Sequence, residues 1–218
     1  MEGQDAALGV VTGICGIERN SLRFVGETGH AGTVPMADRR DALVAASRFV
    51  SATSDLARET HSIRATVGSL LVHPNAVNAI PDTTAFSLEI RSVSDGERQS
   101  FARQMRAFGT QIAQDSGLTF EMTKTYEQPA VACDPALSDA LAKAVEQSGQ
   151  RLVKLPSGAT HDASAMSDLC PIAMLFVRCK NGLSHHPDEY ASAADMGAAV
   201  NAIAGFLTSS PIRTPPEI

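Results

Sequence analysis

Apolar and polar residues alternate along four stretches of the chain, and this pattern predicts strands. The predicted strands lie at about 22–25, 63–67, 86–91 and 118–123. Apolar residues at helical spacing predict one helix between the first two strands and another between the last two. The order β-α-β-β-α-β is typical of the split βαβ or ferredoxin-like domain, in which two helices cover one face of an antiparallel sheet. The other face is then open to a ligand or a partner.

The strand at 86–91 indicates which side chains lie on the open face. Phe86, Leu88 and Ile90 alternate with Ser87, Glu89 and Arg91. Since neighbouring side chains of a strand point to opposite faces, the apolar set should pack under the helices. We therefore expect the polar set, which includes Arg91, on the open face.

The chain on either side of this module predicts a second α/β region. A strand candidate at 8–14 comes before the module. After it come a helix from Asp134, a strand near 152–155, a helix from about His161, a strand at 172–177 and a last helix through Phe206. Because this tail would not fold comfortably alone, we expect the module to be inserted between two segments of one α/β domain. The predicted domains are 1–17 with 128–218, and 18–127.

Composition and charge argue against several classes of binding partner. The 218 residues are 44% hydrophobic, enough for a substantial core, and carry a net charge of −6. A negative chain without a run of lysine or arginine argues against nucleic-acid and anionic-membrane partners. The chain shows no signal-peptide pattern and no stretch that could span a bilayer, so we expect a cytoplasmic protein. The four cysteines form no C-x-x-C pair and are expected as free thiols.

Four segments combine chemically capable residues with residues that form tight turns. In the first, 28–36, two glycines and a proline fix a loop around His30. An imidazole in that loop could donate a hydrogen bond to an oxyanion that develops in a transition state. An incidental histidine in a surface loop is the alternative.

The second segment, 77–81, contains Asn78 and is followed on the next strand by Arg91. A side-chain amide offers both a donor and an acceptor, and a guanidinium matches a carboxylate with two parallel hydrogen bonds. The pair could thus hold the carboxylate end of a substrate that resembles an amino acid. In the alternative interpretation Asn78 caps a turn, and Arg91 pairs with Glu89 or with a neighbouring strand.

The third segment, 156–163, is a loop of small residues that enters a predicted helix. Backbone N–H groups at a helix start attract anions, and the adjacent His161 and Asp162 could orient a substrate or each other. The alternative is that Asp162 or Thr160 only caps the helix.

The fourth segment, 183–190, follows the predicted strand at 172–177. Loops after strands of an α/β sheet border the ligand crevice, so a histidine held there before Pro187 is well placed to bind a metal. A pair of exposed loop histidines, His185 and His186, is the alternative. The sequence offers no H-E-x-x-H or H-x-H spacing, so it does not supply a complete metal site.

Nine motifs in this order resemble the carbamoylase and allantoate amidohydrolase branch of the dinuclear zinc aminoacylase and carboxypeptidase superfamily. The resemblance runs from about Leu8 to the end of the chain. The motifs are residues 9–14, 29–33, 35–36, 39–42, 77–81, 89–92, 156–159, 161–163 and 184–185.

This resemblance implies a ferredoxin-like lid and dimerisation domain, inserted in an incomplete zinc-exopeptidase-like α/β domain. It implies that His30 polarises the scissile carbonyl and that Asn78 and Arg91 hold the substrate carboxylate. It also implies substrate contacts from the backbone at Gly158 and from His161, and makes His185 a ligand of a divalent metal. The metal would be zinc, with manganese or cobalt as further choices because such sites accept several divalent ions.

Two departures from the family pattern affect the site. Thr160 stands where the family usually has glycine, and His186 competes with His185 as the metal ligand. In addition, the family segment with the remaining ligands and the general base should precede Leu8. A catalytic zinc needs three or more protein ligands, so we expect this chain to be inactive without a complementary N-terminal segment.

The predicted reaction is hydrolysis of a C–N bond in an N-carbamoyl amino acid or a ureido acid such as allantoate, by a homodimer. Two alternatives remain open. One is a noncatalytic remnant that dimerises or binds a small carboxylate, and the other is a peptidase or N-acyl-amino-acid deacylase of the same superfamily.

Overall fold

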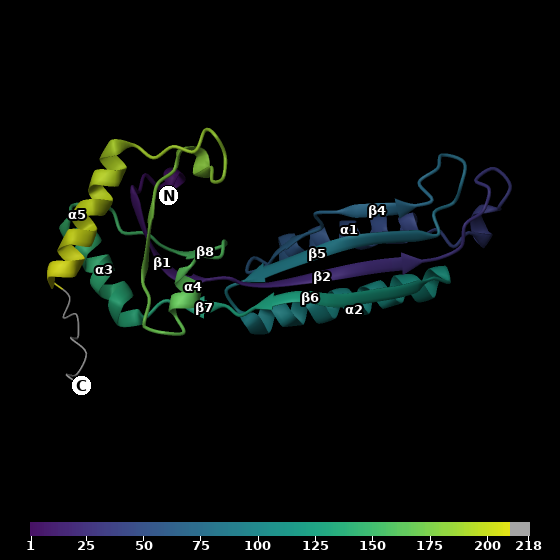
Figure 1. Cartoon of the computed structure of the whole chain (residues 1–218), viewed down its shortest axis with the longest axis horizontal. Helices are drawn as coiled ribbons and strands as arrows, with labels where there is room; N and C mark the ends of the chain where they lie inside the picture. The colour runs from purple at the N-terminus through teal and green to yellow at the C-terminus, as the bar shows by residue number, and fades with distance from the viewer. Residues whose placement is uncertain (210–218) are drawn as a thin grey trace. The chain divides into compact units, whose positions relative to one another are not determined.

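The computed structural model describes residues 1–209, and these divide into two compact units, drawn in Figure 1. Unit 1 combines Met1–Ile14 with the chain from Val131 onward, and unit 2 is Cys15–Ala130. The predicted mixed α/β class is confirmed. The units change at 14/15 and 130/131, slightly outside the predicted boundaries at 17/18 and 127/128, because the first and last strands of unit 2 along the chain reach Gly16 and Gln128.

Unit 2 is an antiparallel sheet with two long helices. Its elements are β2 (Gly16–Val25), the 3-10 turn η2 (Met36–Asp38), α1 (Ala42–Glu59), β3 (Arg64–Thr66), β4 (Leu70–His73), β5 (Thr83–Ser92), α2 (Asp95–Ser116) and β6 (Thr119–Gln128). The strand order is β3-β5-β2-β6, and β4 also pairs with β5. This order is the split βαβ arrangement. The single strand predicted at 63–67 is replaced by two short strands, β3 and β4, which pair in succession along β5.

The core of unit 2 lies between the sheet and the two helices, which are behind the sheet in Figure 1. Phe86, Leu88 and Ile90 are buried in this core, whereas Glu89 and Arg91 are partly exposed. The alternation predicted for this strand is therefore confirmed. The Asp41 carboxylate caps α1, and the Ser94 hydroxyl caps α2.

A buried ion cluster joins the start of α2 to the sheet. Arg98 is 1% exposed, and its guanidinium lies 3.1 Å from Glu18, 3.0 Å from Asp95 and 2.9 Å from Glu127. Burial alone would lower the pKa of Arg98, but the hydrogen bonds to Glu127 and Asp95 raise it above its ordinary value. The Asp95 carboxylate also accepts the N–H of Ala130, the last residue of unit 2.

Gly109 of α2 makes room for an aromatic ring of the core. A Cβ at this position would collide with the ring of Phe120, which is itself packed 4.8 Å from the Phe24 ring. We expect Gly109→Ala to lower the free energy of unfolding by about 1–3 kcal/mol through overpacking. Gly197→Ala in the last helix is the control, because no atom lies within 4 Å of its Cβ position. It should be stabilising by up to about 1 kcal/mol. Urea titration of both variants tests this, and stabilisation by both would contradict the packing argument.

Unit 1 is built around strand β1 (Leu8–Ile14). Its other elements are η1 (Glu2–Gln4), β7 (Val131–Ala132), α3 (Pro135–Gln147), β8 (Lys154–Ser157), α4 (Ala163–Met166), β9 (Met174–Val177), η3 (Lys180–Gly182) and α5 (Ala193–Ser209). β1 pairs in parallel with β8 and antiparallel with β7 and β9. Residues of α3 and α5 pack against β1 in one core cluster.

Two features of unit 1 differ from the sequence prediction. The helix expected from about His161 is the single turn α4, Ala163–Met166, which is too short to act as a helix with an anion-binding start. Helix α5 buries Ala198, Ala199 and Ala202, while Met196, Val200 and Ile203 lie on its exposed side. No helix among residues 1–209 is long and apolar enough to cross a bilayer.

Candidate functional site

Two loops at one end of unit 2 bring His30 and Asn78 together. The N–H of Ala31 donates to the carbonyl of Asn78 at 2.9 Å, and the N–H of Ile80 donates to the carbonyl of Gly29 at 2.8 Å. His30 and Ala79 form an isolated β-bridge between the loops. Both His30 and Asn78 are exposed. Among the described residues the Asn78 side chain makes no capping bond, so the turn-cap interpretation lacks support.

The loop around His30 determines which nitrogen of the imidazole accepts a hydrogen bond. Its Nδ1 lies 3.1 Å from the N–H of Gly32, which donates to it. A neutral ring that accepts at Nδ1 carries its proton on Nε2. The guanidinium of Arg39 holds the same loop through the carbonyls of Ala31, at 2.5 Å, and Val34, at 3.1 Å. The exposed imidazole is thereby held with a hydrogen-bond donor at Nε2, the group that an oxyanion requires.

Arg91 is held in a chain of ion pairs on the sheet. Its Nε lies 2.6 Å from Glu89, and Glu89 lies 2.7 Å from Nε of Arg19. Burial would raise the pKa of Glu89, but hydrogen bonds from Arg91 and Arg19 hold it below its usual value. Burial raises the pKa of the Cys15 thiol, while Arg91 opposes that shift. The alternative prediction that Arg91 pairs with Glu89 is confirmed.

Arg91 lies at the opposite end of unit 2 from His30 and Asn78. Along the β2–β5 pair, Thr83 faces Val25 at the end with the loops, and Arg91 faces Ile17 at the other end. Arg91 lies eight residue positions beyond Thr83 on this strand, which is about 26 Å at 3.3 Å per position. One copy of unit 2 therefore does not bring Asn78 and Arg91 to the same small carboxylate. Arg91 instead lies near Cys15, where the chain enters the unit.

The open face of the sheet contains a shallow hollow of about 520 Å³. Arg19, Ser87 and Glu89 contribute to its lining. The hydroxyl of Ser87 accepts the N–H groups of Gly68 and Ser69, at 3.2 and 3.1 Å. Sequence reasoning missed Arg19, although its position opposite Glu89 follows once β2 and β5 are paired in register.

In unit 1 the loop after β8 carries Gly158 and His161. His161 is half-buried, and its Nε2 lies 2.7 Å from the hydroxyl of Ser157. Gly158 is exposed, and its Cβ position would meet nothing within 4 Å. Asp162 stands at the start of α4 without a side-chain capping bond, so it is not a cap in the usual sense. Ser157 was not singled out from the sequence.

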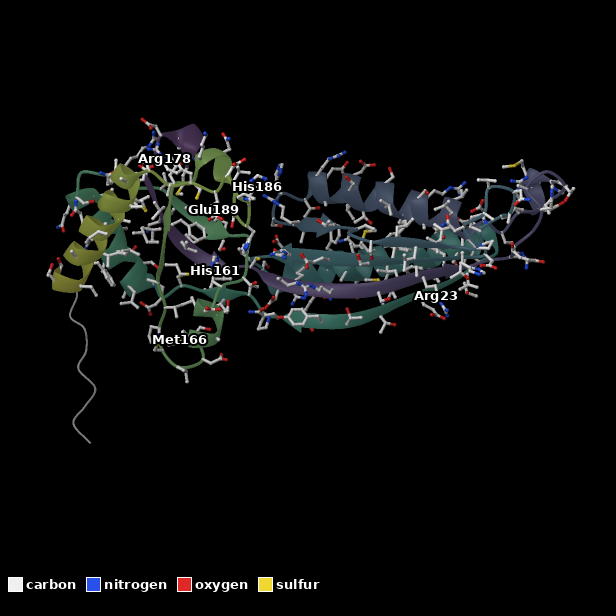
Figure 2. The ribbon with its side chains drawn as sticks, turned by 45° about the horizontal axis from the view of Figure 1, so that its top comes forward. Arg23, His161, Met166, Arg178, His186 and Glu189 are labelled. Atoms are coloured by element: carbon white, nitrogen blue, oxygen red, sulfur yellow. The ribbon has the colours of Figure 1, made fainter. Side chains whose placement is uncertain are left out.

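The loop after β9 carries His185 and His186, whose imidazole rings differ in their hydrogen bonding. Nδ1 of His186 accepts the N–H of Asp188 at 3.1 Å. The backbone N–H of His185 donates to Glu189 at 2.9 Å, and His185 has a left-handed φ of 57°. Within residues 1–209 the His185 ring has no hydrogen-bond partner, so its nitrogens are the more available. Figure 2 labels His161, His186 and Glu189 on unit 1 and Arg23 on unit 2.

The donor side chains among residues 1–209 do not make up a metal centre. The part of the chain that the structure describes holds no group of three or more histidine, cysteine, aspartate or glutamate side chains placed to bind a metal. A single available imidazole is fewer donors than a catalytic metal needs. The residues present therefore do not fit a complete metal site.

These observations define a mixed α/β protein of two units, with a split βαβ unit between two segments of the other. The chain belongs to the peptidase family M20/M25/M40, whose sequence profile matches residues 21–209. This confirms the family resemblance seen in the sequence.

Similar proteins narrow the branch of the family. The chain is 33% identical over 202 residues to N-carbamoyl-L-amino acid amidohydrolase of Geobacillus stearothermophilus, covering 92% of this chain and 49% of that one. It is 32% identical over 229 residues to allantoate deiminase of Arabidopsis thaliana, with 93% and 44% covered. A crystal structure of a hydantoinase/carbamoylase family amidase from Burkholderia multivorans matches with a TM-score of 0.89 at 33% identity, over 95% of this chain and 51% of that one. The chain thus spans about half the length of these relatives.

Proposed function

We propose that the chain is the lid domain and part of the catalytic domain of an amidohydrolase that acts on N-carbamoyl amino acids or ureido acids such as allantoate. The observation that carries this proposal is the match over more than nine-tenths of the chain to an N-carbamoyl-L-amino acid amidohydrolase. The loop geometry adds support, because His30 is held as a hydrogen-bond donor at an exposed end of unit 2.

In the proposed reaction each residue has a separate task. The Nε2–H of His30 donates to the carbonyl oxygen of the scissile group as negative charge develops on it. Asn78 and Arg91 hold the substrate carboxylate, since an amide donor and a guanidinium both match its oxygens. Gly158 contributes its backbone, and His161 contributes its ring to substrate binding. His185 is a ligand of a divalent metal, zinc or alternatively manganese or cobalt, whose other ligands come from outside this chain.

A homodimer explains how His30 and Arg91 serve one site. The two residues are separated by about 26 Å or more of strand in one copy, too far for one small substrate. In a twofold dimer, the loop end of one copy meets the Arg91 end of its partner, and the reverse contact occurs at the second site. Each site then takes His30 and Asn78 from one copy and Arg91 from the other. The exposed edge formed by β3 and β4 supplies a route for the lid domains to pair.

A complementary N-terminal segment completes the catalytic domain in this proposal. The relatives are about twice as long as the matched region. Helix α5 also exposes an apolar stripe, which consists of Met196, Val200, Ile203 and Leu207. A stripe of that kind is typical of a helix that packs against further protein.

The test is a hybrid enzyme in which this chain replaces the matched half of the Geobacillus stearothermophilus relative. With a divalent metal added, the hybrid should release ammonia from an N-carbamoyl amino acid or from allantoate, while this chain alone should not. Hydrolysis of N-acetyl amino acids but not of N-carbamoyl ones would assign the deacylase alternative. No hydrolysis of either class by a folded, dimeric hybrid would favour the noncatalytic alternative.

A further inference from the structure

Ser157 and His161 form a partly buried hydrogen-bonded pair, and the proposed function gives Ser157 no role. Ser157 is 1% exposed, and its hydroxyl oxygen lies 2.7 Å from Nε2 of His161. The same oxygen lies 2.9 Å from the carbonyl oxygen of Ala159 and 3.2 Å from the Ala159 nitrogen. Three polar partners therefore surround one hydroxyl that has a single proton.

Counting donors and acceptors selects one arrangement. A serine hydroxyl donates one hydrogen bond and accepts two. The Ala159 carbonyl has no proton, so the hydroxyl must donate to it for that contact to be favourable. The hydroxyl then accepts from the Ala159 N–H, and its second acceptor position faces His161. His161 must therefore donate from Nε2. The opposite tautomer would leave the serine oxygen facing the carbonyl oxygen without a proton between them, which is costly for a buried group.

The second ring nitrogen of His161 is left as an acceptor. A neutral imidazole with its proton on Nε2 has a lone pair on Nδ1. The Phe176 ring of β9 packs 5.6 Å from the imidazole centroid, so the ring plane is restrained on that side. Within residues 1–209 no hydrogen-bond partner reaches Nδ1, and His161 is only partly buried.

We propose that Ser157 is a positioning residue that holds His161 with its proton on Nε2, so that Nδ1 accepts a hydrogen bond from the terminal amino group of the substrate's ureido group. The identity of the substrate rests on the proposed function. A carboxylate has no hydrogen to donate, so this contact recognises the ureido end of the substrate. An N-acetyl group has a methyl where the N-carbamoyl group has an amino group, so the same contact discriminates between these two classes.

Nuclear magnetic resonance of the full chain tests the positioning step without any activity. With ¹⁵N-labelled histidine, at a pH well above the ordinary pKa of imidazole, His161 should show a slowly exchanging Nε2–H proton. Ser157→Ala should remove that resonance through exchange with water, and Ser157→Thr should restore it. Ser164→Ala is the matched control, because Ser164 is also buried and its hydroxyl has no partner among the described residues. A proton on Nδ1 in the unaltered chain, or an unchanged resonance in a folded Ser157→Ala chain, would overturn the proposal.

The recognition step is tested in the hybrid enzyme. Ser157→Ala should lower kcat/KM for an N-carbamoyl amino acid about tenfold more than for the N-acetyl form of the same amino acid, the effect of one lost hydrogen bond. Equal losses for the two substrates would overturn the recognition role while leaving the proposed function intact. A hybrid inactive on both classes would instead remove the proposed function and the recognition role with it, while the His161 resonance still decides the positioning step.

Discussion

Replacing Arg98 with methionine is expected to lower the free energy of unfolding by about 3–5 kcal/mol, the usual cost of removing one partner from a buried ion pair. Methionine fills much of the space of the arginine stem but offers no donor. Glu18, which is 5% exposed, would lose its cationic partner, and Asp95 and Glu127 would lose a shared one. The buried carboxylate of Glu18 would then have to be protonated or hydrated for unit 2 to stay folded.

The control for this prediction lies on the same helix. Arg103 of α2 is exposed and forms no ion pair within residues 1–209, so Arg103→Met should change the free energy of unfolding by no more than about 0.5 kcal/mol. Both variants are compared by urea titration followed by circular dichroism. Adding Glu18→Gln to Arg98→Met should recover part of the loss, because the uncompensated charge is removed. Equal effects of Arg98→Met and Arg103→Met would show that the buried cluster contributes little.

The second large effect concerns the hybrid enzyme, in which replacing Arg91 should change mainly KM and replacing His30 should change mainly kcat. Arg91→Ala is expected to raise KM about a hundredfold, because a substrate carboxylate loses a charged, hydrogen-bonded partner. His30→Ala is expected to lower kcat by about 10²–10³ with a smaller change in KM, because its hydrogen bond strengthens only as the oxyanion forms.

Two matched controls accompany these variants. Arg23→Ala removes a different arginine of the sheet, one that is exposed and pairs with Glu121 at 3.1 Å, and should leave both kcat and KM near their starting values. Arg91→Lys should recover only part of the loss in KM, because an ammonium lacks two parallel N–H donors. A loss with Arg23→Ala equal to that with Arg91→Ala would mean that general charge, and not a specific carboxylate contact, is responsible.

Much of the fold could be predicted because local patterns and packing agree. The strand at 86–91 alternates cleanly. Helix α2 is capped by Ser94 before its start and by the left-handed Gly117 after its end, so its sequence marks both ends. The helix expected from about His161 is present but is only the single turn Ala163–Met166, because a run of small residues can enter a long helix or a single turn equally well. The bounds of the edge strands β3 and β4 could not be predicted, because these strands are short and form only by pairing with β5.

The candidate site was harder to predict because its residues are distant in sequence. The motifs around His30 and Asn78 were found separately, and only the paired loops show that they lie side by side. Arg91 was expected beside Asn78, but the register of β2 and β5 places it at the other end of the sheet. Ser157 lies within the motif at 156–159, but its own role could not be predicted because it depends on a contact with His161 four residues later.

The central claim is that one active site draws His30 from one copy of the chain and Arg91 from its partner, and mixed dimers test it most directly. Hybrid enzymes with His30→Ala and with Arg91→Ala, each nearly inactive alone, are co-expressed with different tags or unfolded and refolded together. Random pairing of two copies should restore about one quarter of the original activity, because half of the dimers are mixed and each of these has one intact site. Activity that stays at the level of the separate variants, in samples shown to contain mixed dimers, would contradict the shared site.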